Sequence, residues 1–94
     1  MSESTGIAGP CLRLYIAGRT TLANRAIANA RALVRDHLPE GTSLEIVDLE
    51  DDPIRADEHR VLATPMLVQI GDGRARSIVG DLSDLTGALS GLGY

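Results

Sequence analysis

The stretch Leu62-Ala63-Thr64-Pro65-Met66-Leu67 constrains the fold more than any other part of this chain. Proline has no backbone N–H to donate, so within a sheet it is confined to the start of a strand or to an edge. It also drives the preceding residue out of the helical region, so a helix that leads into Thr64 has to end there. The cis form costs an X-Pro bond only about 0.5–1 kcal/mol. The stretch therefore predicts a Thr64-Pro65 hinge between a short helix and a buried strand.

Before this hinge, the pattern predicts a strand, a helix and a second strand. Residues 11–17 alternate between apolar and polar side chains, as a half-buried strand does, and residues 43–49 form a second apolar run between turn residues. Between them, Thr20 or Thr21 can cap a helix that ends at Pro39. The side chains expected on the buried faces are Leu12, Leu14 and Ile16 on the strand and Ala23, Ala26, Ile27, Ala30, Leu33, Val34 and Leu38 on the helix.

A short helix is expected after the second strand. Asp52 can be its N-cap, because Pro53 then takes the first helical position, where its missing N–H costs nothing. Ile54 and Val61 lie seven residues apart, so we expect this helix to carry Ile54, Val61 and Leu62 inward.

After the hinge, residues 66–70 predict a strand, Gly71-Asp72-Gly73 a tight turn, and residues 74–79 an antiparallel strand. Asp81 is the expected cap of a last helix. Gly87, Gly91 and Gly93 each lower the stability of a helix by about 1 kcal/mol relative to alanine, so this helix is marginal by its own propensity. The apolar residues expected on its buried face are Leu82, Leu85, Ala88, Leu89 and Leu92.

This order, βαβαββα, predicts an α/β protein of thioredoxin-like architecture. In that architecture the proline that begins the third strand is characteristically cis, so we expect a cis Thr64-Pro65 bond. The chain is short enough for one core only. We expect a disordered tail over residues 1–10 and a single domain over residues 11–94.

Composition argues against several classes of partner. A net charge of −4, a pI of about 4.9 and an aromatic content of 2% are unlike a nucleic-acid-binding protein, which needs basic patches and stacking rings. No apolar run has the length of a membrane span, and the first ten residues resemble neither a signal nor a transit peptide. We expect a cytoplasmic protein that binds no nucleic acid and no membrane.

The residues predict no catalytic, metal or cofactor site. A redox protein of this architecture would carry Cys-x-x-Cys after the first strand, at the start of the helix, where the thiol pKa is lowered. That stretch has no sulfur, and Cys11, which lies before it, is interpreted as structural. His37 is expected to cap a helix end or lie on the surface, and His59 has no second metal ligand at helical spacing.

Four segments carry a resemblance to a known family. Leu12–Gly18, Val47-Asp48-Leu49, Leu62–Leu67 and Ile78–Asp84 look like the corresponding segments of the KaiB family of circadian-clock proteins, with matching spacing from about Leu12 to Leu92. The last segment is the most specific, because Thr-Pro occurs across thioredoxin-like proteins.

The resemblance implies a non-enzymatic module that docks on a KaiC-type hexameric ATPase in a timing or stress system. It further implies KaiA or a clock histidine kinase as additional partners. The family is also metamorphic, with a tetrameric or dimeric ground state. That alternative fold, βαββααβ, differs in the second half of the chain.

Family positions that match residue by residue give a set of candidate site residues. The resemblance implies Arg25, Arg60 and Arg76 for partner binding and Thr64, Pro65, Gly91 and Gly93 for the change of fold. Two other functions stay open at this stage: a thioredoxin-like oxidoreductase, and a stand-alone sensor domain like that of the clock histidine kinase SasA.

Overall fold

The sheet of this protein has four strands in the order β2-β1-β3-β4, seen in a computed structural model that describes residues 11–70 and 76–94. β1 is parallel to β2, whereas β3 is antiparallel to both β1 and β4. The elements in chain order are β1 (Cys11–Ile16), α1 (Thr21–His37), β2 (Ser43–Asp48), the 3-10 helix η1 (Pro53–Glu58), β3 (Met66–Ile70), β4 (Arg76–Val79) and α2 (Leu85–Gly91).

The predicted fold class is confirmed. The order of elements is βαβαββα, the Thr64-Pro65 bond is cis, and β3 starts directly after Pro65. The alternative arrangement would place a helix there and is not the one observed. The predicted turn at 71–73 and the predicted tail over 1–10 lie outside the described residues.

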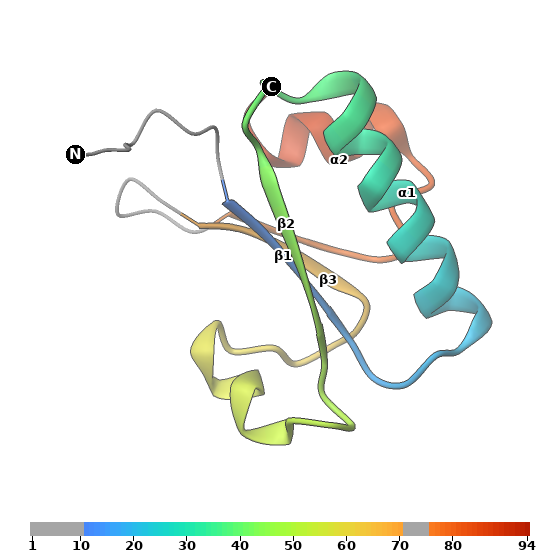
Figure 1. The fold of residues 1–94 in the computed structure, drawn as a ribbon, viewed down its shortest axis with the longest axis vertical. Helices are drawn as coiled ribbons and strands as arrows, with labels where there is room; N and C mark the ends of the chain where they lie inside the picture. The colour runs from blue at the N-terminus through green and yellow to red at the C-terminus, as the bar shows by residue number, and fades with distance from the viewer. Residues whose placement is uncertain (1–10, 71–75) are drawn as a thin grey trace.

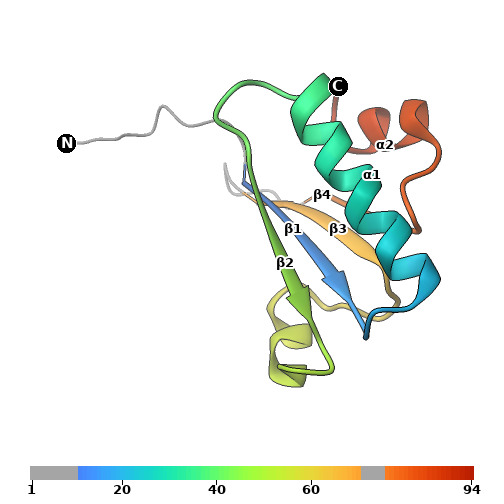
Figure 2. The ribbon, with the colours of Figure 1, turned by 45° about the vertical axis from the view of Figure 1, so that its right-hand side comes forward.

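Helices cover the two faces of the sheet unequally (Figures 1 and 2). α1 and α2 pack together on one face, and η1 lies on the other. The larger apolar cluster lies under α1 and α2, and a smaller one lies on the η1 face. The η1 face is therefore the thinly covered side of the molecule.

β1 supplies both clusters because its side chains alternate between the faces. Leu12, Leu14 and Ile16 are buried against the helices, as the pattern predicted. Tyr15 points the other way and is fully buried in the smaller cluster. That cluster consists of Tyr15, Val47, Met66 and Val68.

α1 begins and ends where the sequence indicates. Thr20 is the N-cap, and its Oγ1 accepts a hydrogen bond of 3.0 Å from the backbone N–H of Ala23. Leu38 is the C-cap and precedes Pro39. Among the described residues, no helix combines the length and apolar character needed to cross a membrane.

The prediction for the short helix is right about where it starts and wrong about its buried face. Ile54 is 79% exposed and Leu62 is 95% exposed, and only Val61 packs against the η1-face cluster. Asp52 does occupy the N-cap position before Pro53, although its side chain makes no capping hydrogen bond. The reason is that η1 is a 3-10 helix ending at Glu58, so helical spacing does not extend to the residues that follow.

The start of the last helix is also corrected. Asp84, rather than Asp81, is the N-cap, and its Oδ1 accepts a 3.0 Å hydrogen bond from the N–H of Gly87. Leu82 lies before the helix with a φ of +66° and is buried, whereas Leu85 is 40% exposed. The left-handed residue breaks the helical register that the sequence pattern assumed.

Candidate docking surface

The three arginines singled out from the sequence lie at two ends of the sheet. Arg25 lies near the start of α1, just after β1 ends, and Arg60 lies in the connection between β2 and β3, residues 49–65. Arg76 begins β4 and lies opposite Gln69, which in turn pairs with Leu12 at the start of β1. The structure therefore brings Arg25 and Arg60 to one end and separates Arg76 from them.

The connection exposes apolar and cationic side chains together. Ile54 and Leu62 are the two most exposed large hydrophobic side chains among the described residues. Between them, Arg60 is exposed and has a φ of +52°. A non-glycine residue in the left-handed region costs roughly 1–2 kcal/mol, and such strained residues cluster at functional sites.

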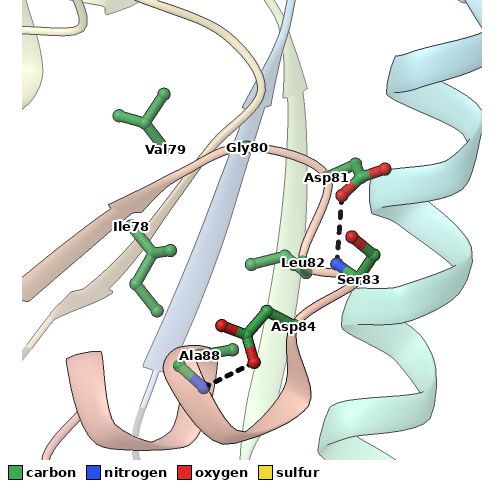
Figure 3. A pocket seen from close by; sticks show the side chains of 9 residues that line it. Ile78, Val79, Gly80, Asp81, Leu82, Ser83, Asp84 and Ala88 are labelled. Atoms are coloured by element: carbon green, nitrogen blue, oxygen red, sulfur yellow. Dashed lines mark hydrogen bonds between the residues drawn. The ribbon is translucent and has the colours of Figure 1, made fainter.

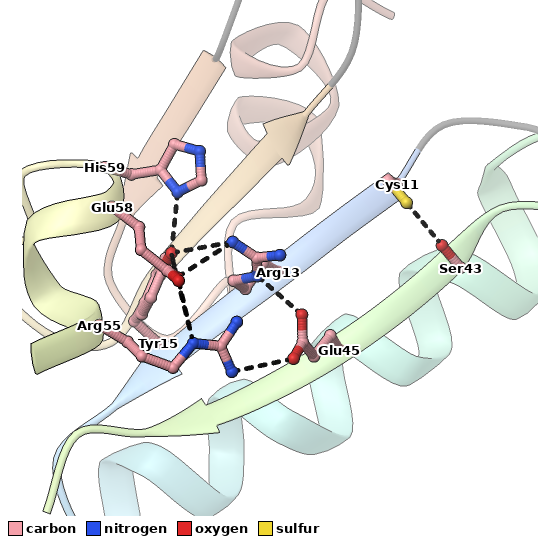
Figure 4. Close-up of polar contacts among 8 residues, drawn as sticks. All are labelled: Cys11, Arg13, Tyr15, Ser43, Glu45, Arg55, Glu58 and His59. Carbon is pink, nitrogen blue, oxygen red and sulfur yellow. Dashed lines mark hydrogen bonds and ion pairs between the residues drawn. The ribbon is translucent and has the colours of Figure 1, made fainter. Parts of the chain in front are cut away.

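An ion-pair ring, formed by Arg13, Glu45, Arg55 and Glu58, lies on the η1 face (Figure 4). Arg13 Nε lies 2.8 Å from Glu45 Oε1, and Arg13 Nη1 lies 3.2 Å from Glu58 Oε1. Arg55 Nη1 lies 3.0 Å from Glu45 Oε2, and Arg55 Nε lies 3.2 Å from Glu58 Oε2. Each carboxylate thus lies between two guanidinium groups, and the ring is closed and neutral.

The ring joins three separate segments. Arg13 comes from β1, Glu45 from β2, and Arg55 and Glu58 from η1. Arg13 and Glu45 lie directly opposite each other in the parallel register. The ring therefore attaches the connection to the two strands beneath it.

The ring holds the pKa of both its carboxyl groups below the ordinary value. For Glu45 the main cause is the hydrogen bond from Arg55, followed by the hydrogen bond from Arg13. For Glu58 the hydrogen bond from Arg55 is again the first cause. Both carboxylates are therefore charged at neutral pH and act as acceptors.

Tyr15 and His59 extend the ring on the side of β1. The Tyr15 hydroxyl lies 3.1 Å from Glu58 Oε1 and 2.8 Å from His59 Nδ1. A hydroxyl has one hydrogen, and the Glu58 carboxylate can only accept. When Tyr15 donates to Glu58, the proton of the second bond has to come from His59 Nδ1, an assignment that follows from the network. Burial raises the pKa of Tyr15, so its hydroxyl stays protonated.

A hollow of about 380 Å³ lies between β4 and α2, around the loop that joins them (Figure 3). Ile78, Leu82 and Ala88 form part of its apolar lining. Two carboxylates, Asp81 and Asp84, lie at its rim, and both already accept backbone hydrogen bonds, from Ser83 and Gly87. Because the Asp81 and Asp84 carboxylates already stabilise the loop and cap α2, few of their oxygen atoms remain available to bind a ligand in the hollow.

Arg25 is tied to the same loop. Its Nη1 lies 3.7 Å from Asp81 Oδ2, and its side chain remains 61% exposed. The side chain and backbone of Ser83 are the main causes that lower the pKa of Asp81. The Arg25 guanidinium thus keeps most of its surface available.

The residues singled out for a change of fold lie where α2 meets β4 and where β3 begins. A Cβ on Gly91 would lie 2.9 Å from Ile78 Cγ1, so this glycine permits the close approach of α2 to β4. Gly93 has a φ of +91° and lies against the Arg76 guanidinium. Thr64 is half-buried and Pro65 is buried.

The thiol lies far from where redox chemistry of this architecture takes place. Cys11 starts β1, is exposed, and its Sγ lies 3.1 Å from Ser43 Oγ (Figure 4). At the other end of β1, the loop before α1 is held by Asp48, whose Oδ1 accepts a 2.9 Å bond from the Gly18 N–H. Within residues 11–70 and 76–94, no group of three or more His, Cys, Asp or Glu side chains could hold a metal ion.

Sequence reasoning missed both the ring and the exposed apolar residues of the connection. Arg13 and Glu45 each lie between apolar residues of their strands, so both are expected on the same, less buried face of the sheet. That pattern could have indicated the pair. The pairing of Arg55 and Glu58 with them could not be read from spacing, because it depends on how η1 crosses the sheet face.

Comparison with known proteins covers nearly the whole described chain. The family model described as the KaiB domain matches residues 13–93. The circadian clock oscillator protein KaiB of Rippkaea orientalis is 37% identical over 81 residues, which are 86% of this chain and 78% of that protein. The circadian clock protein KaiB3 of Synechocystis sp. is 35% identical over 81 residues, which are 86% and 79% of the two chains.

Solved structures support the same fold. The N-terminal domain of Synechococcus elongatus SasA superposes with a TM-score of 0.64 at 26% identity, covering 98% of this chain and 90% of that one. Mitochondrial thioredoxin 3 of Saccharomyces cerevisiae superposes with a TM-score of 0.71 at 19% identity, covering 90% and 77%. At that identity the second likeness shows the fold alone.

Proposed function

Since this chain belongs to the KaiB family, we propose that it is a non-enzymatic regulatory module that docks on a KaiC-type hexameric ATPase. Its relatives are named as circadian clock proteins. The proposal places this protein in the cytoplasm, in a circadian or a stress-related timing system, with no cofactor of its own.

The observation that carries the proposal is the exposed surface of the connection. Leu62 and Ile54 are left in solvent at 95% and 79% exposure, and Arg60 between them is held in a strained conformation. Large apolar side chains left in solvent are a feature of protein–protein contact surfaces, and arginine is enriched in such surfaces. We assign Arg60, together with Arg25 at the same end of the sheet, to the docking surface.

A second partner class is supported by the likeness to the SasA N-terminal domain. Two proteins with the same fold and related sequences can compete for one site on the ATPase. KaiA or a clock histidine kinase is therefore proposed as a competitor or additional partner. The alternative reading of this chain as a sensor domain predicts that its gene continues into a kinase region.

The change of fold remains part of the proposal. Thr64 and Pro65 separate the first half of the chain from the second, and Gly91 and Gly93 lie at the packing contacts of the last helix. Two packings of one sequence can differ by a few kcal/mol only. A dimeric or tetrameric ground state would use the second half differently.

Co-elution of the purified protein with a cognate KaiC-type hexamer tests the docking proposal. We expect a complex in at least one nucleotide or phosphorylation state, and weaker binding by Leu62→Ser, whose exposed side chain contributes little to folding. Cys11→Ser should bind as the wild type does. Absence of any complex at high micromolar concentration across all of these states would contradict the proposal.

A further inference from the structure

η1, in the middle of the connection between β2 and β3, is attached to the sheet by side chains. η1 contains no buried residue. Among the described residues, the backbone hydrogen bonds that begin in η1 and the residues after it stay within the connection, as from the Val61 N–H to the Ala56 carbonyl at 2.9 Å. In the described part of the chain, backbone bonds to the sheet are confined to the two ends of the connection. At its start the Leu49 N–H donates to the Ile16 carbonyl of β1, and the N–H groups of Asp51 and Asp52 donate to the Asp48 carbonyl of β2. At its end the Pro65 carbonyl accepts from the Gly80 N–H. The backbone therefore does little to fix the orientation of η1.

The ion-pair ring supplies what the backbone lacks. Arg55 and Glu58 each contact a strand residue, and each carboxylate of the ring is held by two guanidinium groups. Closed networks of this kind are more effective than isolated surface pairs, because a side chain that is ordered once makes two contacts. Val61 adds an apolar contact with the η1-face cluster.

The ring is accessible to salt, whereas the sheet is not. Exposure of the ring side chains ranges from 21% for Arg13 to 48% for Glu45. Mobile ions screen such groups, with a Debye length that falls from about 30 Å at 0.01 M to about 3 Å at 1 M. The sheet is stabilised on this face by apolar packing of Tyr15, Val47, Met66 and Val68. Salt does not screen these contacts.

We propose that the ion-pair ring is a salt-sensitive clamp that positions the connection and thereby presents Ile54, Arg60 and Leu62 for docking. The docking half of this inference rests on the proposed function, and the clamp half does not. Arg13, Glu45, Arg55 and Glu58 are positioning residues, because they act through the orientation of η1. Loss of the clamp frees the connection while the four-stranded sheet stays folded.

Amide hydrogen exchange measured by NMR tests the clamp without any partner. Between about 0.01 M and about 1 M NaCl, exchange of the Val61 amide should accelerate about three- to tenfold, while the Leu14 amide in β1 keeps its rate. Arg55→Met keeps the apolar stem and removes two ion pairs, so Val61 should exchange at the faster rate already at low salt. An unchanged Val61 rate in either experiment overturns the clamp.

Arg35→Met is the matched control for charge removal. Arg35 also forms two hydrogen bonds with a carboxylate, that of Asp36, but it lies on α1 away from the connection. We expect this variant to leave the Val61 exchange rate unchanged. The same acceleration in Arg35→Met and Arg55→Met would mean that general charge effects are responsible, and would overturn the clamp.

Binding to the KaiC-type hexamer tests the docking half separately. Arg55→Met should weaken the complex by the factor by which the fraction of molecules with the closed connection falls, because the apparent Kd is the intrinsic Kd divided by that fraction. Equal binding by a variant in which the Val61 amide has lost its protection from exchange, so that the connection is mostly open, would overturn the docking half. If the wild type binds no such hexamer, the proposed function fails, and the exchange experiment still decides the clamp.

Discussion

Tyr15 is the residue at which the apolar and polar parts of the η1 face meet. Its ring is buried among Val47, Met66 and Val68, and its hydroxyl contacts Glu58 and His59. The ring centroids of Tyr15 and His59 lie 6.0 Å apart. One side chain of β1 thus stabilises the small cluster and orients two residues at the end of η1.

We expect Tyr15→Phe to lower the free energy of unfolding by about 1–2 kcal/mol. The ring still fills its site, but Arg13, Glu58 and His59 each lose a hydrogen-bond partner. Urea unfolding at neutral pH measures the change. Tyr94→Phe is the control, because Tyr94 is 51% exposed, and it should change stability by less than about 0.5 kcal/mol. Equal effects of the two substitutions would contradict this role of the hydroxyl.

The ring carboxylates predict a loss of stability in acid. Because the folded state lowers the pKa of Glu45 and Glu58, their contribution is present above the unfolded pKa of about 4.3. It is lost as the pH falls through the lower folded values. Urea unfolding across pH 7 to 3 should show this decline.

Arg55→Met identifies the ring as a source of this decline. Without that guanidinium, the folded pKa of both carboxyl groups moves back toward the ordinary value, so the loss of stability in acid should be smaller than in the wild type. Other carboxylates with a lowered pKa, including Asp48 and Asp81, still contribute to the loss of stability in acid, so the decline does not vanish. Identical acid profiles for variant and wild type would exclude the ring as a contributor.

At the scale of elements, the loop before α2 shows how backbone strain is balanced by burial. Leu82 has a φ of +66°, which is unfavourable for a leucine, yet its side chain is buried in the main cluster. Asn29 on α1 donates a 2.8 Å hydrogen bond to the Asp81 carbonyl and fixes the loop. Leu85, three residues later, faces solvent instead.

The two leucines should therefore respond differently to truncation. Leu82→Ala should cost about 2–3 kcal/mol, through lost burial and a residual cavity. Leu85→Ala, at a 40% exposed site, should cost less than about 1 kcal/mol. Denaturant unfolding of both variants compares them directly. The helix register starting at Asp81 buries both leucines, so equal costs at the two positions would support that register and contradict the one described here.

The contact between α2 and β4 depends on a glycine. A Cβ on Gly91 would lie 2.9 Å from Ile78 Cγ1 and 3.1 Å from its Cδ1. We expect Gly91→Ala to destabilise this arrangement by about 1–3 kcal/mol, as overpacking does, although alanine has the better helix propensity. Denaturant unfolding and the shifts of α2 amide resonances measure the effect.

A double-mutant cycle separates overpacking from other causes. Ile78→Ala removes both atoms that the new methyl group would meet, so the double variant should lose less stability than the two single variants predict. Ser90→Ala, at an exposed position of the same helix, is the control and should be neutral or slightly stabilising. If the stability losses of Gly91→Ala and Ile78→Ala simply add in the double variant, the proposed contact is contradicted.

At the scale of the whole molecule, the candidate partner-binding arginines lie at opposite ends of the sheet. Arg60 and Arg25 lie where β1 ends, and Arg76 lies where β1 begins, beside Gly93. A docking site centred on the connection would include the first two and leave Arg76 outside.

We therefore expect Arg60→Asn to weaken binding to a KaiC-type hexamer at least tenfold. Asparagine tolerates the left-handed conformation of this position, so the fold should be unaffected. Arg76→Asn is the matched charge removal and should weaken binding less than threefold. Titration of the hexamer with each variant measures both effects, and a greater loss for Arg76 would place the docking surface at the other end of the sheet.

The sequence by itself determined the order of the elements and the course of the main core. Alternation in β1, the cap at Thr20 and the strand that starts directly after Pro65 are local signals, because each depends on neighbours within a few residues. The family likewise follows from the sequence, since the KaiB domain match spans residues 13–93. These features were predicted correctly.

Only the tertiary structure decided where the side chains of the connection and of the loop before α2 point. Ile54 and Leu62 are apolar, and yet they are exposed because η1 is anchored by charged partners on β1 and β2 rather than by its own apolar face. The cap at Asp84 depends on Leu82, which leaves helical geometry to reach the core between α1 and α2. Such outcomes depend on contacts between segments far apart in the chain, and local pattern carries no information about them.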